Sequence, residues 1–275
     1  MAIVLSLLSA VAYGVSDFLG GIFAKRVSAW QVAVVGQSSS MVCTGVAAIA
    51  VGGSPTGHDL LFGALAGLGG GFGAAFLYRG LSTARMSVVA PLSGVGAALI
   101  PVAVGLGTGD RPSVTALVGV VLAFPAITLI SRVADDSAAH RSGVGDGVLA
   151  GLGFGLLFTF LGQVGDGGAL YPLALSQVTS VVAIVLTAVV LRRPWVPRGR
   201  PAWTAAWMGP LGAVAQGAFL LATQHGLLSV VSVISSLYPA STVLLAAVLL
   251  RERVQRWQAI GLALAALAVS MVALG

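Results

Sequence analysis

Residues 227–275 have the sequence LLSVVSVISSLYPASTVLLAAVLLRERVQRWQAIGLALAALAVSMVALG. Two apolar runs, 228–250 and 257–274, flank a short charged turn that contains Arg251, Glu252 and Arg253. A helix of about 20 apolar residues spans the hydrocarbon core of a bilayer, which is about 30 Å thick. Each run is therefore long enough to cross a membrane, and the pair predicts a helical hairpin embedded in lipid.

The same pattern continues through the rest of the chain. Of 275 residues, 57% are hydrophobic and only 8% are charged, whereas a soluble domain has about one quarter charged residues. The mean hydropathy is +1.02. Apolar runs bounded by charge, Pro or Gly cover residues 2–22, 28–51, 60–80, 86–107, 113–131, 147–164, 170–191, 204–224, 228–250 and 257–274. The sequence predicts an all-α integral membrane protein of ten transmembrane helices with short loops.

Short sequence motifs in the first half of the chain recur in the same order in the second half. Four matches occur in the same order: Phe18-Leu19-Gly20 with Phe160-Leu161-Gly162, Gly36-Gln37-Ser38-Ser39 with Ser176-Gln177-Val178-Thr179, Tyr78-Arg79-Gly80-Leu81 with Gln224-His225-Gly226-Leu227, and Asp110-Arg111 with Glu252-Arg253. We expect one repeat over 1–131, a polar linker over 132–146 and a second repeat over 147–275. Because each repeat holds five helices, an odd number, the second is inserted with inverted topology, as in many secondary transporters.

The region from Leu227 to Gly275 resembles the EamA-type permeases of the drug/metabolite transporter superfamily. The similarity rests on Tyr238-Pro239 in the ninth run, on Leu250-Arg251-Glu252-Arg253, and on Gln258 and Gly261 early in the last run. In the first half, the corresponding turn reads Gly109-Asp110-Arg111, with Asp in place of Glu. The resemblance extends over nearly the whole chain and implies a ten-helix exporter or exchanger of small metabolites, without specifying the metabolite.

Basic residues are distributed unevenly among the expected loops. The odd-numbered loops contain 13 of the 14 Lys and Arg residues, and the even-numbered loops contain only Arg111. The positive-inside rule then places the odd loops in the cytoplasm and both termini outside. Ten-helix members of the superfamily are usually drawn with both termini inside, so the two predictions conflict, and we favour the residue count. The expected location is the cell membrane of a prokaryote, as a multi-pass protein.

Small residues and one proline stand out as packing and hinge candidates. Gly63, Gly67 and Gly71 recur every four residues on the third helix, and Gly147, Gly151 and Gly155 do so on the sixth. Such rows mark close helix contacts in lipid, although glycine is also generally enriched in membrane helices. Pro239 breaks backbone hydrogen bonding within a predicted span, next to the polar ring of Tyr238, and is the hinge candidate.

Asp17 is the only acid well inside a predicted span. Charges inside a bilayer are costly and are usually functional. Asp17 lies about two helical turns before Lys25, and Arg79 approaches the same side of the membrane, so we hypothesise an ion pair between Asp17 and Arg79. Asp17 would then serve proton coupling or bind a substrate cation; the alternative is that it snorkels to the interface or caps a neighbouring helix.

Further polar side chains complete the candidate site. Gln37 and Gln177 occupy matching positions in the two repeats, where they bind ligand or join helices. Tyr13 and Tyr78 fit pore edges or interfacial belts. The second half contributes Gln216, Gln224, His225, Ser235 and Tyr238. His225 titrates near physiological pH when hydrated, but at a helix end it is more often an interfacial residue.

Several other classes of protein lack their required residues. The chain has one cysteine, Cys43, and three widely separated histidines, so no metal motif or disulfide is expected. It lacks a phosphate-binding Gly-x-x-x-x-Gly-Lys loop and protease motifs, so neither an enzyme nor an ATP-driven pump is expected, and no cofactor or nucleic acid partner. The sequence favours a secondary transporter that exports a small polar metabolite, first an amino acid or related compound, with protons as a further partner. The alternatives are an exporter of hydrophobic cations or drugs, or a membrane scaffold or receptor without transport. We expect a monomer, with a dimer as the alternative.

Overall fold

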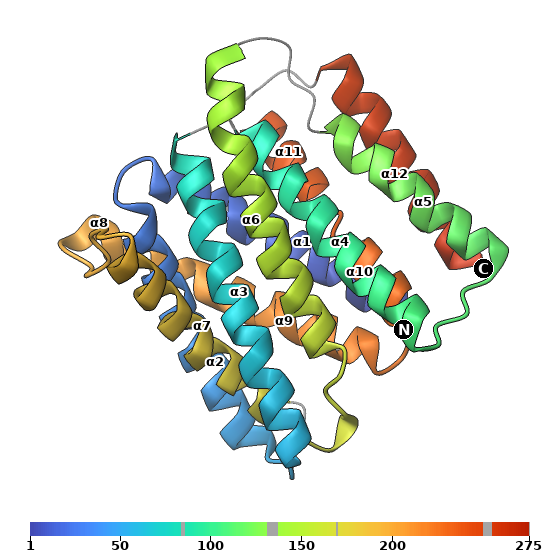
Figure 1. Cartoon of the computed structure of the whole chain (residues 1–275), viewed down its shortest axis with the longest axis horizontal. Helices are drawn as coiled ribbons and strands as arrows, with labels where there is room; N and C mark the ends of the chain where they lie inside the picture. Colours follow the sequence, from blue (N-terminus) through green and yellow to red (C-terminus); the bar gives the residue numbers. More distant parts are fainter. Residues whose placement is uncertain (84–85, 131–136, 169, 250–254, 275) are drawn as a thin grey trace.

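The computed structural model describes residues 1–83, 86–130, 137–168, 170–249 and 255–274, which form helices joined by turns (Figure 1). The helices are α1 (Ala2–Ala24), α2 (Ala29–Val51), α3 (Gly57–Thr83), α4 (Met86–Thr108), α5 (Val114–Ile130), α6 (Ser137–Leu161), the short η1 (Asp166–Gly168), α7 (Leu170–Val190), α8 (Arg200–Trp203), η2 (Thr204–Trp207), α9 (Met208–Thr223), α10 (Leu228–Ser235), α11 (Tyr238–Leu249) and α12 (Arg256–Leu274). The described part of the chain contains no strand, which confirms the all-α prediction.

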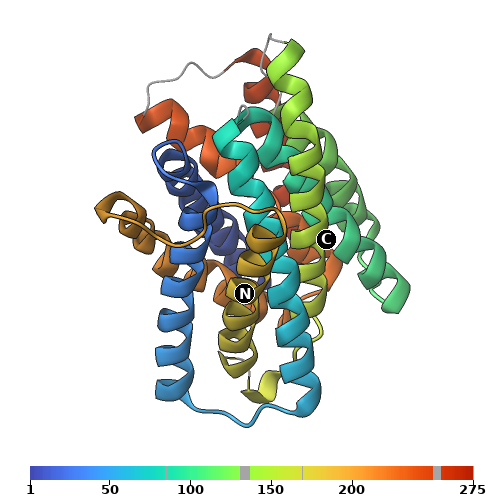
Figure 2. The same cartoon turned by 60° about the vertical axis from the view of Figure 1, so that its left-hand side comes forward.

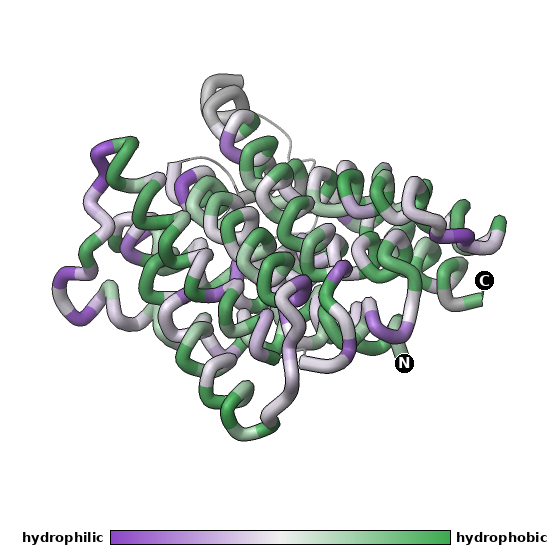
Figure 3. The backbone as a smooth tube through the Cα atoms, turned by 60° about the horizontal axis from the view of Figure 1, so that its bottom comes forward, coloured by the Kyte–Doolittle hydropathy of each residue, from purple (hydrophilic) through white to green (hydrophobic). Residues whose placement is uncertain are grey.

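Seven helical runs in the described residues are long and apolar enough to cross a membrane. They are Ala2–Ala24, Ala29–Val51, Gly57–Thr83, Gly143–Leu161, Leu170–Val190, Arg200–Thr223 and Leu228–Leu249; three shorter apolar helices are Leu92–Thr108, Val114–Leu129 and Arg256–Val272. These runs coincide with the ten predicted segments. Figure 3 shows that apolar residues dominate the helices and that hydrophilic positions gather mostly in loops and at helix ends. That all ten segments cross the membrane stays a prediction.

Two details of the predicted boundaries are wrong. The segment 132–146, expected as a linker, is helical from Ser137 onward, because α6 begins there and continues to Leu161. The ninth predicted run is two helices, since α10 ends at Ser235 and α11 begins at Tyr238. Pro239 is the second residue of α11, and a proline lacks the backbone N–H that a continuous helix requires, although it is tolerated in a first turn.

Helices of the two halves are interleaved. In the first half, α3 packs against α6 and α7, and α4 packs against α6; in the second half, α9 packs against α1 and α2, and α10 and α11 pack against α1. Two further contacts, α2 with α7 and α5 with α12, also join the two halves, and Figure 1 shows α5 and α12 running together at one side of the bundle. That the two halves are inverted repeats stays a prediction.

The glycine row on α3 lies against the backbone of α7. A Cβ placed on Gly63 would lie 2.5 Å from the carbonyl oxygen of Pro172, and one on Gly67 would overlap the carbonyl oxygen of Ser176. Thr179 reinforces the contact, because its hydroxyl donates to the carbonyl oxygen of Ala64 at 2.9 Å. The predicted role of this row in close helix packing is confirmed.

The second glycine row, on α6, lies against α4 in the same way. A Cβ on Gly151 would lie 3.0 Å from Cα of Gly96, and a Cβ on Gly155 would lie 2.8 Å from the carbonyl oxygen of Gly96. On another face of α6, a Cβ on Gly153 would overlap the backbone nitrogen of Gly73 in α3. Because the hydrophobic effect does not drive helices together in lipid, this close packing contributes much of the free energy of helix association.

We expect Gly67→Ala to lower the thermal stability of the detergent-solubilised protein. The added methyl group has no space between α3 and α7, and overpacking of this kind costs about 1–3 kcal/mol. Gly45→Ala is the matched control, since no atom lies within 4 Å of a Cβ at this helical position on α2. The control should keep or raise the unfolding temperature. Equal stability of the two variants would contradict the packing account.

Candidate functional site

A cavity lies between α1, α2, α3, α6 and α9, so both halves of the chain contribute to its wall. About 490 Å³ of space not filled by atoms lies between these helices, including the part that is open to the surroundings. Its polar lining residues are Tyr13, Ser16, Asp17, Gln37, Ser40, Tyr78 and Gln216, and the apolar part of the wall includes Phe154, Leu157 and Met208. Five of the predicted site residues, Tyr13, Asp17, Gln37, Tyr78 and Gln216, therefore lie together.

Asp17 is the acid of this cavity and is only 5% exposed. The hydroxyl of Tyr78 donates a long hydrogen bond of 3.4 Å to its Oδ1. Within the residues that the structure describes, no cationic side chain pairs with Asp17. Because an isolated buried carboxylate is costly to keep ionised, this site favours a proton or a positively charged group of a ligand.

Tyr13 lies four residues before Asp17 and so shares its face of α1. Its hydroxyl is buried without a hydrogen-bond partner among the described residues. Its ring lies near two other aromatic rings, with centroids 5.8 Å from that of Phe158 and 6.3 Å from that of Tyr238. The unused hydroxyl can donate to or accept from a molecule that enters the cavity.

A Gln-x-x-Ser pattern occurs on both α2 and α7, at Gln37 and Ser40 and at Gln177 and Ser180. Nε2 of Gln37 donates to Oγ of Ser180 at 2.9 Å, across the contact between the two helices. The equivalent groups are unused: Oγ of Ser40 and both side-chain polar atoms of Gln177 are buried without a partner. Gln177 is 0% exposed and lies outside the cavity lining, so Gln37 and Gln177 play different parts in this structure.

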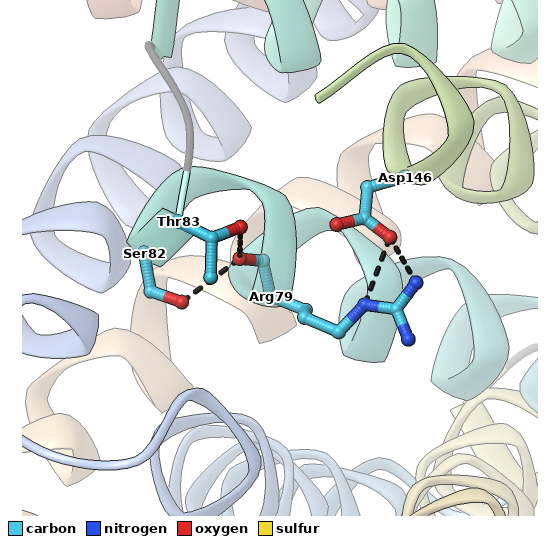
Figure 4. Close-up of polar contacts among 4 residues, drawn as sticks. All are labelled: Arg79, Ser82, Thr83 and Asp146. Atoms are coloured by element: carbon cyan, nitrogen blue, oxygen red, sulfur yellow. Dashed lines mark hydrogen bonds and ion pairs between the residues drawn. The ribbon is translucent and has the colours of Figure 1, made fainter. Parts of the chain in front are cut away.

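The hypothesised pair of Asp17 and Arg79 is wrong. Arg79 donates from Nε to Oδ1 of Asp146 on α6 at 2.8 Å, and its terminal nitrogen binds the same oxygen (Figure 4). The guanidinium carbon also lies 4.4 Å from the centroid of the Phe76 ring. Successive residues of a helix point about 100° apart, so Tyr78 on α3 reaches Asp17 while the neighbouring Arg79 faces α6.

Other predicted residues of the second half lie outside the cavity lining. Gln224 is half-buried at the end of α9, and His225 is exposed just after it. Ser235 is buried, and its hydroxyl donates to the carbonyl oxygen of Ser6 at 3.5 Å. The predicted site included residues that do not line the cavity. A sequence indicates how deep in the membrane a side chain lies, but not which way it points around its helix.

Tyr238, at the start of α11, is 2% exposed and stands behind Tyr13. Its hydroxyl shares a short hydrogen bond with Oγ of Ser93, which ties α11 to α4. Tyr238 therefore supports the wall of the cavity rather than lining it. Pro239 is the second residue of α11 and follows the break at Ser236 and Leu237, and its role as a hinge stays a prediction.

Ser16, Ser40 and Phe154 line the cavity but were absent from the predicted set. Two signals in the sequence could have found the serines. Ser16 is adjacent to Asp17, and Ser40 lies three residues after Gln37 and thus on the same helical face. No sequence pattern distinguishes Phe154 from the other aromatic residues of α6.

The apolar helices, which enclose a cavity lined by both polar and apolar residues, define a multi-pass membrane protein. The sequence model of the EamA-like transporter family matches residues 141–274. The match covers just under half of the chain, so this part is similar to the EamA-like transporter family, a family of membrane transporters, and the resemblance predicted from the sequence is confirmed.

Other comparisons concern the fold. The chain is similar to a solved protein described only as "Crystal structure of protein", with a TM-score of 0.76 over 99% of this chain and 96% of the other. At 15% sequence identity this likeness shows a shared fold and no more. No curated protein matches the chain.

A double-mutant cycle tests the new assignment of Arg79. We expect Arg79→Gln and Asp146→Asn to be coupled by about 1–2 kcal/mol in the free energy of unfolding, because a charged hydrogen-bonded pair is lost by either change. The matched cycle of Arg79→Gln with Asp17→Asn should be additive. Coupling of Arg79 to Asp17 instead of Asp146 would restore the original hypothesis.

Proposed function

We propose that the protein is a secondary transporter that moves a small, amine-bearing polar metabolite, such as an amino acid or a related compound, by alternating access. The observation that carries this proposal is Asp17, a buried carboxylate without a cation in a cavity walled by both halves of the chain. The family match of residues 141–274 supports transport rather than catalysis or a scaffold role.

The charge of the cavity supports an amine as the recognised group. Asp17 can accept hydrogen bonds from an ammonium group, and the hydroxyl of Tyr13 stands on the same helical face. The carboxylate of an amino acid would be met by the neutral amides of Gln37 and Gln216, because Arg79 is held by Asp146 outside the cavity lining. Strongly anionic substrates would need several cationic side chains, and the described lining contains none.

The second candidate is an exporter of hydrophobic cations. Two tyrosines and Phe154 line the cavity together with the single acid, and aromatic faces attract cations once water is excluded. A hydrophobic cation would interact with the carboxylate of Asp17 and with the aromatic rings, and it would form no hydrogen bonds with the amides of Gln37 and Gln216. Comparison of an amino acid with its decarboxylated amine separates the two candidates.

Alternating access is supported by the exchange of partners between the halves. The contact pattern of α3, α6 and α7 recurs in α9, α1 and α2, as two inverted repeats would require. The bond between Gln37 and Ser180 is formed, whereas its counterpart, Gln177 with Ser40, is not. We propose that the second bond forms, and the first one breaks, when the cavity opens to the other side.

Membrane, direction and coupling are parts of the same proposal. The excess of basic residues in the odd loops supports their placement on the cytoplasmic side of a prokaryotic cell membrane. We propose export as the direction, a monomer as the working unit, and protons as the coupling ion, since a buried carboxylate that exchanges a cationic group for a proton stays neutral in both states.

Asp17→Asn should lower transport of amine substrates by about tenfold or more in vesicles reconstituted with the purified protein, because a hydrogen bond to a charged group is lost. Asp146→Asn is the matched control, since that carboxyl is also buried but lies outside the cavity lining, and it should keep most of the activity. Uptake of labelled amino acids and amines measures both variants.

The same variant separates binding from coupling. Loss of exchange at equal substrate concentrations and of accumulation driven by a pH gradient means that Asp17 binds substrate. Loss of accumulation alone means that Asp17 only relays protons. If both activities survive unchanged, Asp17 is structural and the proposed site is wrong.

Ser180→Ala and Ser40→Ala should shift the conformational equilibrium in opposite directions. The first removes a bond that is present in this structure, and the second removes its proposed counterpart in the other state. Each loss of about 1 kcal/mol corresponds to about a fivefold change in population. A cysteine at Ser16, in a background with Cys43→Ser, reports cavity access by labelling from either face of sealed vesicles. Shifts in the same direction would contradict the exchange.

A further inference from the structure

Two segments at one end of the bundle carry six cations and no carboxylate. The turn after α1 contributes Lys25 and Arg26, and the segment between α7 and α9 contributes Arg192, Arg193, Arg198 and Arg200. All six side chains are exposed. Together they form a surface that we call the basic platform.

Hydrogen bonds between the two segments hold the basic platform together. Oγ of Ser28 donates to the carbonyl oxygen of Pro194 at 2.9 Å, and Nε2 of Gln31 donates to that of Val196 at 2.7 Å. Trp195 packs against the hydrophobic cluster that includes Trp30. In Figures 1 and 2 the segment with α8 projects from the bundle. These contacts fix the backbone of both segments, so the backbone positions of the six cations do not depend on interactions among their side chains.

The cations of the basic platform have no anionic partner in the protein. Within the described ranges the ion pair is that of Arg79 with Asp146, so none of the six is neutralised there. Like charges held close together without counter-charges repel each other, and an external anion relieves this repulsion. Arginine presents paired N–H groups that match the oxygens of a phosphate.

Two exposed tryptophans adjoin the basic platform. Trp203 in α8 is 59% exposed, and Trp207 in η2 is 76% exposed. Indole rings concentrate at the headgroup level of a bilayer, where one edge is apolar and the other is hydrated. Tryptophans next to arginines are typical of a surface at the headgroup level, which favours a lipid over a soluble polyanion as the bound anion.

We propose that the basic platform binds the headgroup phosphate of an anionic phospholipid, with Arg192, Arg193, Arg198 and Arg200 as the principal ligands. Binding there fixes the segment between α7 and α9, and α9 carries Met208 and Gln216 of the cavity wall. The proposal concerns a surface separate from the cavity and stands whether or not the proposed substrate is correct.

The test titrates the full-length, detergent-solubilised chain with phosphatidylglycerol, with phosphatidylcholine of the same acyl chains, and with inorganic phosphate, and follows the thermal unfolding temperature. We expect stabilisation by phosphatidylglycerol at a concentration about tenfold or more below that needed for phosphatidylcholine, since each basic side chain adds attraction to an anionic surface. Inorganic phosphate alone should have little effect, because it lacks the acyl chains that bring the headgroup to the tryptophans.

Variants decide the assignment. The quadruple change of the four arginines to Gln should remove the preference for phosphatidylglycerol, and Arg198→Gln alone should lower it about twofold. Arg111→Gln, in the loop between α4 and α5, is the matched control and should leave it unchanged. The single variant keeps the test valid even when the quadruple variant does not fold.

Two results would overturn the proposal. A preference for phosphatidylglycerol that persists in Arg198→Gln and in the quadruple variant would place the lipid elsewhere on the protein. Stabilisation by inorganic phosphate that equals that by phosphatidylglycerol and depends on the same arginines would show a site for a free anion instead of a lipid.

Discussion

Close contact between helix backbones at glycines is the interaction on which the arrangement of this bundle depends. The hydrophobic effect does not drive helices together in lipid, so close van der Waals packing holds the bundle. Side chains larger than glycine at these contacts would keep the helix backbones apart. On α3 one glycine row meets α7, while Gly69 and Gly73 meet α6 on another face, with hypothetical Cβ contacts to Gly153 and Phe154 of 2.8 Å each. With α3 fixed between two helices of the other half, its rotation is fixed as well.

The rotation of α3 in turn determines the electrostatics of the site. Tyr78 faces α1 and donates to Asp17, and the next residue, Arg79, faces α6 and pairs with Asp146. The cation is thereby kept away from the cavity, and Asp17 is left as a carboxylate that a ligand or a proton can neutralise. Helix α3 thus provides a hydrogen bond to Asp17 and an ion pair to the other half of the chain. A movement of α3 would alter both contacts together.

Much of the fold follows from the sequence, whereas the site follows only in part. Charge-bounded apolar runs located most of the helical segments to within a few residues, because the hydrophobic thickness of a bilayer sets their length. The exceptions are the early start of α6 at Ser137 and the division of the ninth run into α10 and α11. The contact role of the glycine rows was also predicted correctly, because small residues at four-residue spacing let helix backbones approach each other. The partner of Arg79 was not, because depth in the membrane is encoded in position along the chain but direction around a helix depends on all of its neighbours. The unequal use of Gln37 and Gln177 is likewise invisible in two matching sequence patterns, since it belongs to one conformation of the protein.

The proposed function depends most on recognition of a positively charged amine by Asp17. Counterflow in vesicles reconstituted with the wild-type protein tests this recognition directly, with pairs of compounds that differ only in whether the amine is free or acetylated. We expect the free amines to exchange with internal substrate and their acetylated counterparts not to exchange. Equal exchange of both members of each pair, or exchange of carboxylates without an amine, would contradict it.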